Sequence, residues 1–162
     1  MGMVNATADH HIDVQKTPER MFRQALSFCL HILVSLLIYA AIFAGITYFN
    51  PLDWPALATT LMVFVLPLVV AYGIHLRGAT TEAGHIWIAG VVWLLMIVVY
   101  VLELPTGPGS CEHCTALSKI WLTLFDLNTD SNLIGGAGRV IGTWPALAVI
   151  GYSIGAGLSL RR

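Results

Sequence analysis

Two of the three cysteines, Cys111 and Cys114, form a C-x-x-C motif with Glu112 and His113 between them. A thiol at the start of a helix lies near unpaired backbone N–H groups, which favour the reactive thiolate. The motif is therefore compatible with a structural disulfide, a redox-active dithiol or a metal clip. The interpretation that we favour is a local disulfide.

For a metal clip, the candidate ligands are Cys111, His113 and Cys114, with Glu103 or Glu112 as a fourth ligand. Zinc sites usually draw their ligands from two separated clusters along the chain. The sequence offers no second cluster of this kind. We therefore predict no metal site, and these three residues remain its weak candidates.

Three histidines, His31, His75 and His85, lie near the ends of apolar stretches. Histidines on facing helices can ligate haem or metal, and an ionisable group inside a membrane is a functional candidate by default. His75 and His85 are expected at the membrane interface in contact with water, and His31 about 10 Å deeper at 1.5 Å per residue. We expect packed or interfacial histidines rather than cofactor ligands, which leaves haem, quinone and metal open.

Two glycine pairs have the G-x-x-x-G spacing: Gly138 with Gly142, and Gly151 with Gly155. Small residues four apart allow the backbones of two helices to approach closely in lipid. We expect these pairs to pack against other helices of the same chain. Contact with another chain is the alternative.

The composition predicts the elements that position these residues. The chain has 162 residues, of which 57% are hydrophobic and only 10% charged, far from the balance of a soluble domain. Four stretches without Asp, Glu, Lys or Arg are each long enough to cross a bilayer as a helix. The sequence thus predicts an all-α integral membrane four-helix bundle within residues 24–160. The expected spans are about 25–49, 55–76, 84–103 and 140–160.

Residues 1–23 are expected to form a polar tail and a basic turn beside the membrane, with the first helix beginning at Thr17 and Pro18. Short links make the first three spans sequential antiparallel neighbours. The loop 104–139 is longer. Within it, residues 115–127 have apolar side chains at helical spacing, with Lys119 on the opposite side, which predicts an amphipathic helix lying in the membrane surface.

The distribution of basic residues predicts the orientation of the spans. One side of the membrane collects most of them, and the other side holds only Lys119 and Arg139. By the positive-inside rule, both termini are cytoplasmic and the C-x-x-C loop lies on the outer side, where thiols are oxidised. We expect a bacterial inner membrane. The net charge of −1 gives no support for nucleic-acid binding. The basic residues on the first side are Lys16, Arg20, Arg23, Arg77, Arg161 and Arg162.

Four spans with an outward C-x-x-C motif resemble, in outline, the membrane thiol oxidoreductases of the DsbB and vitamin K epoxide reductase types. The resemblance implies a redox-active pair, Cys111 and Cys114, that passes electrons to a quinone. Those families also need a second outward cysteine pair. Here the only other cysteine, Cys29, is expected near the opposite face, so the relay is incomplete.

The absence of charged residues within the spans argues against an ion-coupled carrier, and no complete catalytic set is present. We therefore expect a non-catalytic subunit or scaffold of a larger membrane assembly, without a cofactor of its own. Its expected partners are membrane lipid and other subunits, or a second copy through small-residue faces. A thiol oxidoreductase is one alternative. A small channel is the other, with a polar face formed by Thr47, Thr59, Thr60, Ser153 and Ser159.

Overall fold

The computed structural model describes residues 8–48, 55–76, 78, 80–103, 115–125 and 139–161, with the side chains of residues 8–17 and 123 left out. These residues form helices, and no strand occurs among them, so the all-α prediction is confirmed. Four candidate spans are long and apolar enough to cross a membrane. They are Pro18–Tyr48, Ala56–His75, Thr81–Glu103 and Arg139–Ser159.

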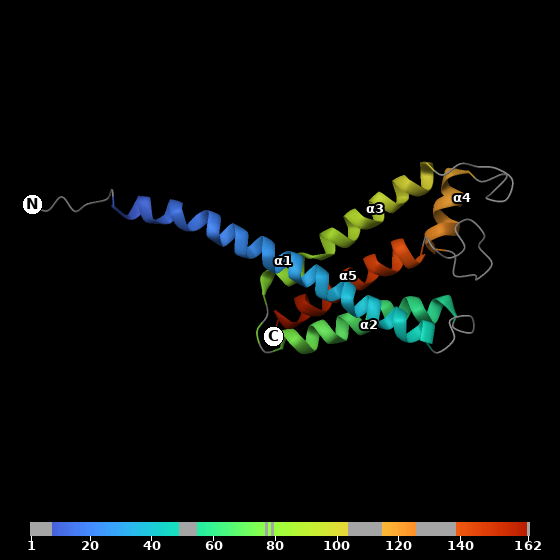
Figure 1. Ribbon diagram of the computed structural model, residues 1–162. Coiled ribbons are helices and arrows are strands. Elements are labelled where there is room, and N and C mark those ends of the chain that lie inside the picture. Colours follow the sequence, from blue (N-terminus) through green and yellow to red (C-terminus); the bar gives the residue numbers. More distant parts are fainter. Residues whose placement is uncertain are drawn as a thin grey trace, which may run out of the picture.

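The helices follow one another as α1 (Ala8–Tyr48), α2 (Ala56–His75), the short 3-10 helix η2 (Thr81–His85) and α3 (Trp87–Glu103). They continue with α4 (Ala116–Ile120), the π-helical turns η3 (Trp121–Phe125) and η4 (Arg139–Thr143), and α5 (Trp144–Ser159). We call the end of the bundle that holds η2 the η2 end, and the opposite end the α4 end (Figure 1).

The predicted start of the first helix at Thr17 and Pro18 is wrong, because α1 already begins at Ala8 and runs through Pro18. A proline inside a helix removes one backbone hydrogen bond, to the carbonyl four residues earlier. The helix α1 continues on both sides of Pro18 despite the loss of this hydrogen bond. The N-terminal part of α1 leaves the bundle as a projecting helix (Figure 1).

The last span is the centre of the bundle. In its most apolar window, 67% of the residues are buried, against 11% to 22% in the other three spans. Each of α1, α2 and α3 packs against α5, and the α2–α5 contact is the most extensive (Figure 1). The prediction that the second and third spans are packed neighbours is wrong, since α5 lies between α2 and α3.

Glycines of α5 bring this helix against α2. A Cβ atom at Gly151 would overlap the carbonyl oxygen of Phe64, and one at Gly155 would overlap that of Leu68. At these two positions only a hydrogen atom fits between the backbones. The Gly151 and Gly155 pair therefore faces a helix of the same chain.

Gly142, a member of the other glycine pair, lies at the α4 end. A Cβ atom at Gly142 would meet the Cγ2 atom of Ile97 on α3 at 2.8 Å and a methyl group of Leu124 at 3.4 Å. Gly142 thus allows η4 to approach both α3 and η3. Its predicted partner in the motif, Gly138, lies outside the described residues.

The turn η4 begins the last span and has a local cause in Pro145. Proline has no N–H group, so residue 145 cannot donate to Ile141 O, its α-helical partner, or to Val140 O, its π-helical partner. Flanking helices supply the donors instead. The Tyr39 hydroxyl donates to Val140 O at 2.6 Å, and the Trp93 Nε1–H donates to Ile141 O at 2.9 Å. These bonds fasten α1 and α3 to the start of α5.

Residues 116–125 are helical, as α4 followed by η3. The Thr115 hydroxyl caps this helix by accepting from the backbone N–H of Ser118 at 3.3 Å. The predicted assignment of faces is wrong for Lys119, which is buried together with Leu124. The exposed face carries Leu117, Trp121 and Phe125.

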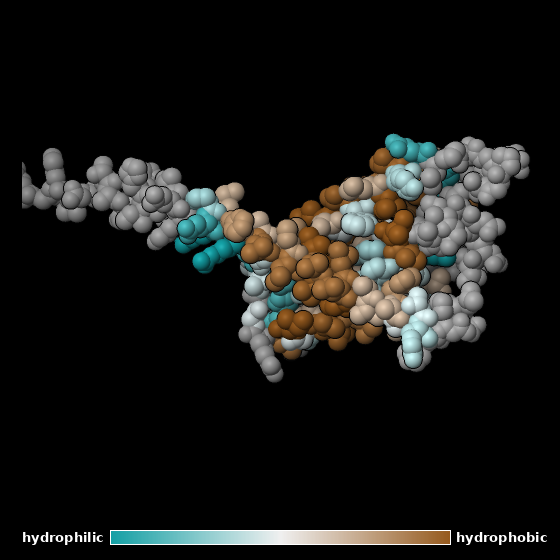
Figure 2. Space-filling view, in the orientation of Figure 1, coloured by the Kyte–Doolittle hydropathy of each residue, from teal (hydrophilic) through white to brown (hydrophobic). Residues whose placement is uncertain are grey.

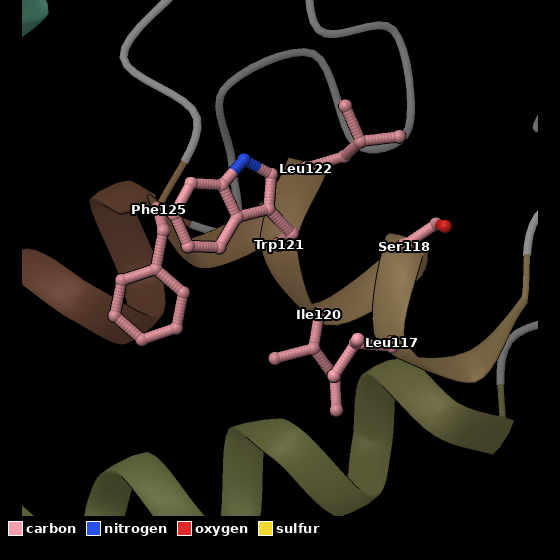
Figure 3. Close-up of a pocket in the computed structure, with 6 residues that line it drawn as sticks. All are labelled: Leu117, Ser118, Ile120, Trp121, Leu122 and Phe125. Carbon is pink, nitrogen blue, oxygen red and sulfur yellow. The ribbon is translucent and has the colours of Figure 1, made fainter.

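Apolar side chains of α4 and η3 line an open groove of about 620 Å³ beside α3 (Figure 3). Within it the Trp121 and Phe125 rings lie side by side, with their centroids 5.7 Å apart. Over the bundle as a whole, hydrophobic side chains cover the middle, and hydrophilic ones gather where α1 leaves it and at the α4 end of α3 (Figure 2). This surface is that of an integral membrane protein.

Candidate functional site

Four side chains from separate elements meet at the η2 end of the bundle. They are His31 of α1, His75 at the end of α2, Thr80 in the link before η2, and Tyr152 of α5. Each of the two histidines lies within the span that carries it. We call these four residues the histidine–tyrosine cluster.

Tyr152 is the most deeply buried residue of the cluster. Its side chain is 1% exposed and belongs to a core that α2, η2 and α5 build together with Ile86, which lies between η2 and α3. Small residues of this core leave room for the large phenol ring. The core consists of Ala71, Ala83, Ile86, Val149, Tyr152 and Ala156.

The Tyr152 hydroxyl lies between the two histidine rings. It is 3.2 Å from His31 Nδ1 and 3.3 Å from His75 Nε2. On the other side of its ring, His31 Nε2 lies 2.9 Å from the Thr80 hydroxyl. The ring centroids of His31 and His75 are 5.1 Å apart. The four groups thus form one continuous hydrogen-bonded chain.

The proton inventory of this chain allows two neutral arrangements, because a hydroxyl both donates and accepts while a neutral imidazole has one N–H and one lone pair. In the first, Tyr152 donates to His31, His31 donates to Thr80, and His75 donates to Tyr152. In the second, every direction is reversed. Conversion of the first arrangement into the second moves one proton along each bond toward Thr80, and it requires that Thr80 releases a proton and that His75 Nδ1 takes one up.

One ring nitrogen of the cluster takes no part in this hydrogen-bonded chain. His75 Nδ1 is buried and has no hydrogen-bond partner among the residues that the structure describes. A buried polar atom without a partner costs free energy, so it is rare unless the site has a function. His75 thus contributes one ring nitrogen to the hydrogen-bonded chain, whereas His31 contributes both.

The elements around the cluster are held by further polar bonds. The Ser153 hydroxyl donates to the carbonyl of Gly84 in η2 at 2.8 Å, which fixes η2 to α5. The Ser35 hydroxyl donates to the carbonyl of Ile32 within α1. Ser153 therefore holds η2 against α5, the helix that carries Tyr152.

The three candidate histidines separate in the structure. His31 and His75 come together, whereas His85 is exposed and bonds to the carbonyl of Thr81 within its own turn. The prediction that His75 is solvated is wrong, because its side chain is only 4% exposed. Side chains of α1 and α5 are the physical reason, since the His75 ring centroid lies 5.1 Å from that of His31 and 5.9 Å from that of Tyr152.

A metal or haem finds little support in this geometry. No group of three or more His, Cys, Asp or Glu side chains suited to a metal ion occurs in the described part of the chain. The two buried histidines direct three of their four ring nitrogens toward hydroxyl groups. These hydrogen bonds between imidazole and hydroxyl groups suit proton transfer better than ligation of an ion.

The candidate thiols are placed only in part. Cys111, His113 and Cys114 lie outside the described residues, and the predicted disulfide there stays a prediction. Cys29 of α1 is exposed and has a free thiol. It lies two residues before His31, toward the η2 end.

A mass-tag experiment tests the predicted disulfide. Under denaturing, non-reducing conditions, we expect a maleimide reagent to modify one thiol per chain, Cys29, and after reduction three. A Cys29→Ser variant serves as the control and should take up no tag before reduction. Three tags on the unreduced wild-type protein would contradict the disulfide.

Comparison with known proteins finds no match for the chain among family models, curated proteins or solved structures. The assignment of function therefore depends on the geometry of the described residues.

Proposed function

We propose that this protein is a non-catalytic subunit or scaffold of a larger membrane assembly, and that it binds a transmembrane helix of another subunit between α1 and α3. The observation that carries the proposal is an apolar groove of about 540 Å³ on the side of the bundle where these two spans face each other across the start of α5. It is lined by Leu36, Tyr39, Ala40, Phe43, Ala44, Thr47, Trp93, Val140, Ile141 and Pro145.

The floor of the groove is held in place before any partner binds. Tyr39 from α1 and Trp93 from α3 both donate hydrogen bonds to carbonyls of η4 beneath it. A preformed groove lowers the ordering cost that binding would otherwise carry. Both walls and the floor thus suit a rigid apolar partner.

Small residues on α1 support a helix as that partner. Ala40 and Ala44 line the groove four residues apart, and Ala40 is exposed. Small residues at this spacing allow a second helix to approach closely in lipid. By contrast, the small residues Gly151 and Gly155 are already used against α2. The face of α1 in the groove is the small-residue face left open to a partner.

The orientation of the bundle belongs to the same proposal. We place both termini in the cytoplasm of a bacterial inner membrane, with the C-x-x-C loop outside. Exposed Arg20, Arg23 and Arg161 near the η2 end support this orientation. Four spans return the chain to the side on which it began.

A substitution in the groove tests the assembly. We expect that gentle detergent extraction from native membranes gives a native-gel band well above the 17.6 kDa chain, with defined companions. Ala44→Leu fills the groove and should reduce the share of chain in that band about ten-fold, equivalent to about 1.4 kcal/mol of binding free energy. The quantity to measure is this share, by immunodetection.

Ala41→Leu is the matched control, because Ala41 is an exposed alanine of α1 outside the groove. It should leave the large band unchanged. A wild-type chain that runs alone after gentle extraction would overturn the proposed function. A large band that survives Ala44→Leu as well as Ala41→Leu would remove the groove as the contact.

A further inference from the structure

We propose that His31 is a proton-binding site: on acidification the histidine–tyrosine cluster takes up one proton from water, which His31 holds between the hydroxyls of Tyr152 and Thr80 while His75 stays neutral. The inference goes beyond the proposed role as a subunit and does not depend on it. Its basis is the geometry of the four side chains.

The hydrogen-bond partners assign the proton to His31 rather than to His75. A protonated imidazole has two N–H groups and needs two acceptors. His31 has both, the Tyr152 hydroxyl at 3.2 Å from Nδ1 and the Thr80 hydroxyl at 2.9 Å from Nε2. A protonated His75 would have only one acceptor, the Tyr152 hydroxyl, and its unpartnered Nδ1–H would belong to a charged ring, which costs more than the same N–H on a neutral ring.

In the protonated state, every other atom of the hydrogen-bonded chain is paired, and His75 Nδ1 alone has no partner among the described residues. With His31 donating to Tyr152 O, the Tyr152 hydroxyl turns its own hydrogen toward His75 Nε2. His75 then accepts this bond as a neutral ring and keeps its own proton on Nδ1. The proton comes from water and no covalent bond other than N–H forms.

A route for the proton leads through Thr80. Its side chain is exposed at the η2 end and bonds directly to His31 Nε2, whereas Tyr152 and His75 are buried. A proton from water at this end therefore reaches His31 across a single hydroxyl. The buried part of the cluster lies behind His31.

The charged and titratable groups around His31 come from three elements. Burial opposes the charged form of His31 most strongly, a charged His75 on α2 would also repel it, and the half-buried Glu82 carboxylate on η2 attracts it. On α5, Tyr152 is neutral at physiological pH. His85 of η2 is exposed and bonds within its own turn.

The pair of rings, His31 and His75, is expected to take up only one proton in the first step. Two charged rings with centroids 5.1 Å apart repel each other strongly in a site that is largely withdrawn from water. Two ionisable groups that interact in this way give up and bind protons in separate steps. The second uptake is therefore expected at a proton concentration at least about ten-fold higher than the first.

Nitrogen-15 NMR of the histidine-labelled full chain, in vesicles of phosphatidylcholine and phosphatidylglycerol, tests the site. Spectra recorded from about pH 8 to about pH 4.5 report the protonation of each ring nitrogen. The resonances are assigned with His31→Gln, His75→Gln and His85→Gln. We expect both His31 nitrogens to become N–H first, with His75 still neutral.

Tyr152→Phe removes one acceptor of the charged ring and should raise the proton concentration needed for His31 uptake by about ten-fold. Tyr39→Phe is the matched control, because its hydroxyl bonds to Val140 at the other end of the bundle. It should leave the titration of His31 unchanged. Circular dichroism of each variant verifies that its helices are retained.

Three outcomes would overturn the proposal. In the first, His31 stays neutral throughout the pH range in which the wild-type protein remains folded. In the second, His75 takes the first proton. In the third, both rings titrate together without separation. Because all three are read from the assigned wild-type spectrum, a Tyr152→Phe variant that fails to fold leaves the test intact.

Discussion

Replacing Gly155 by alanine is expected to destabilise the bundle by about 1–3 kcal/mol, the usual cost of inserting a methyl group into a filled space. The added Cβ atom would overlap the carbonyl oxygen of Leu68, which belongs to the backbone of α2 and cannot turn aside. The contact between α2 and α5 is the most extensive in the fold. Thermal unfolding in detergent micelles, followed by circular dichroism, measures the loss.

Gly157→Ala is the matched control for this substitution. Gly157 lies two residues further along the same helix, and a Cβ atom there would meet nothing within 4 Å. Alanine is the better helix former by about 1 kcal/mol, so this variant should be unchanged or slightly more stable than wild type. Equal unfolding temperatures for Gly155→Ala and Gly157→Ala would contradict the close α2–α5 contact.

The number and positions of the spans could be predicted from the sequence because charge is so costly in lipid. Each charge-free stretch corresponds to one candidate span, with bounds within three residues of those in the structure, except that the first span begins at Pro18 rather than at about residue 25. The order of packing could not be predicted in this way. Apolar spans such as α2 have no amphipathic stripe that would identify the face turned inward.

The central position of α5 has only a partial signal in the sequence. Gly151 and Gly155 form a packing motif, but the motif does not identify the helix that packs against it. The short links favour neighbouring spans. Cβ atoms at these glycines would overlap the carbonyls of Phe64 and Leu68, so the helix packed against the motif is α2. As a result, α5 lies between α2 and α3.

Half of the histidine–tyrosine cluster could be predicted from the sequence. His31 and His75 attract attention because histidine is rare in membrane spans. Tyr152 and Thr80 do not, since aromatic and hydroxyl residues are common near membrane interfaces. Their proximity to the histidines depends on the insertion of α5 between α2 and α3 and on the path of the link before η2.

A similar limit applies to the α4 end. Pro145 near the start of the last span is a visible signal for unsatisfied carbonyls, since proline cannot donate a hydrogen bond. Which side chains satisfy them is a matter of tertiary structure. Tyr39 lies 101 residues before Val140, and Trp93 lies 48 before Ile141. No local pattern connects such pairs.

Replacing Tyr152 by alanine is expected to be the most damaging change at the η2 end. The side chain is the largest of those that are fully buried, and three elements lose their common contact when it is removed. Deletion of a buried aromatic ring costs about 3–5 kcal/mol, through lost burial and the cavity left behind. Urea or thermal unfolding in micelles measures this loss, and Tyr100→Ala on the exposed face of α3 should leave stability nearly unchanged.

Tyr152→Phe separates the ring from the hydroxyl. It keeps the packing and removes only the bonds to His31 and His75, so the expected loss is about 1–3 kcal/mol, the cost of leaving buried polar atoms unpaired. A loss equal to that of alanine would mean that the hydroxyl, and not the ring, holds the η2 end together. A loss of zero would mean that the hydroxyl does not contribute to stability. In that case the stability of the fold would not explain its position between two histidines, and proton binding would remain as its role.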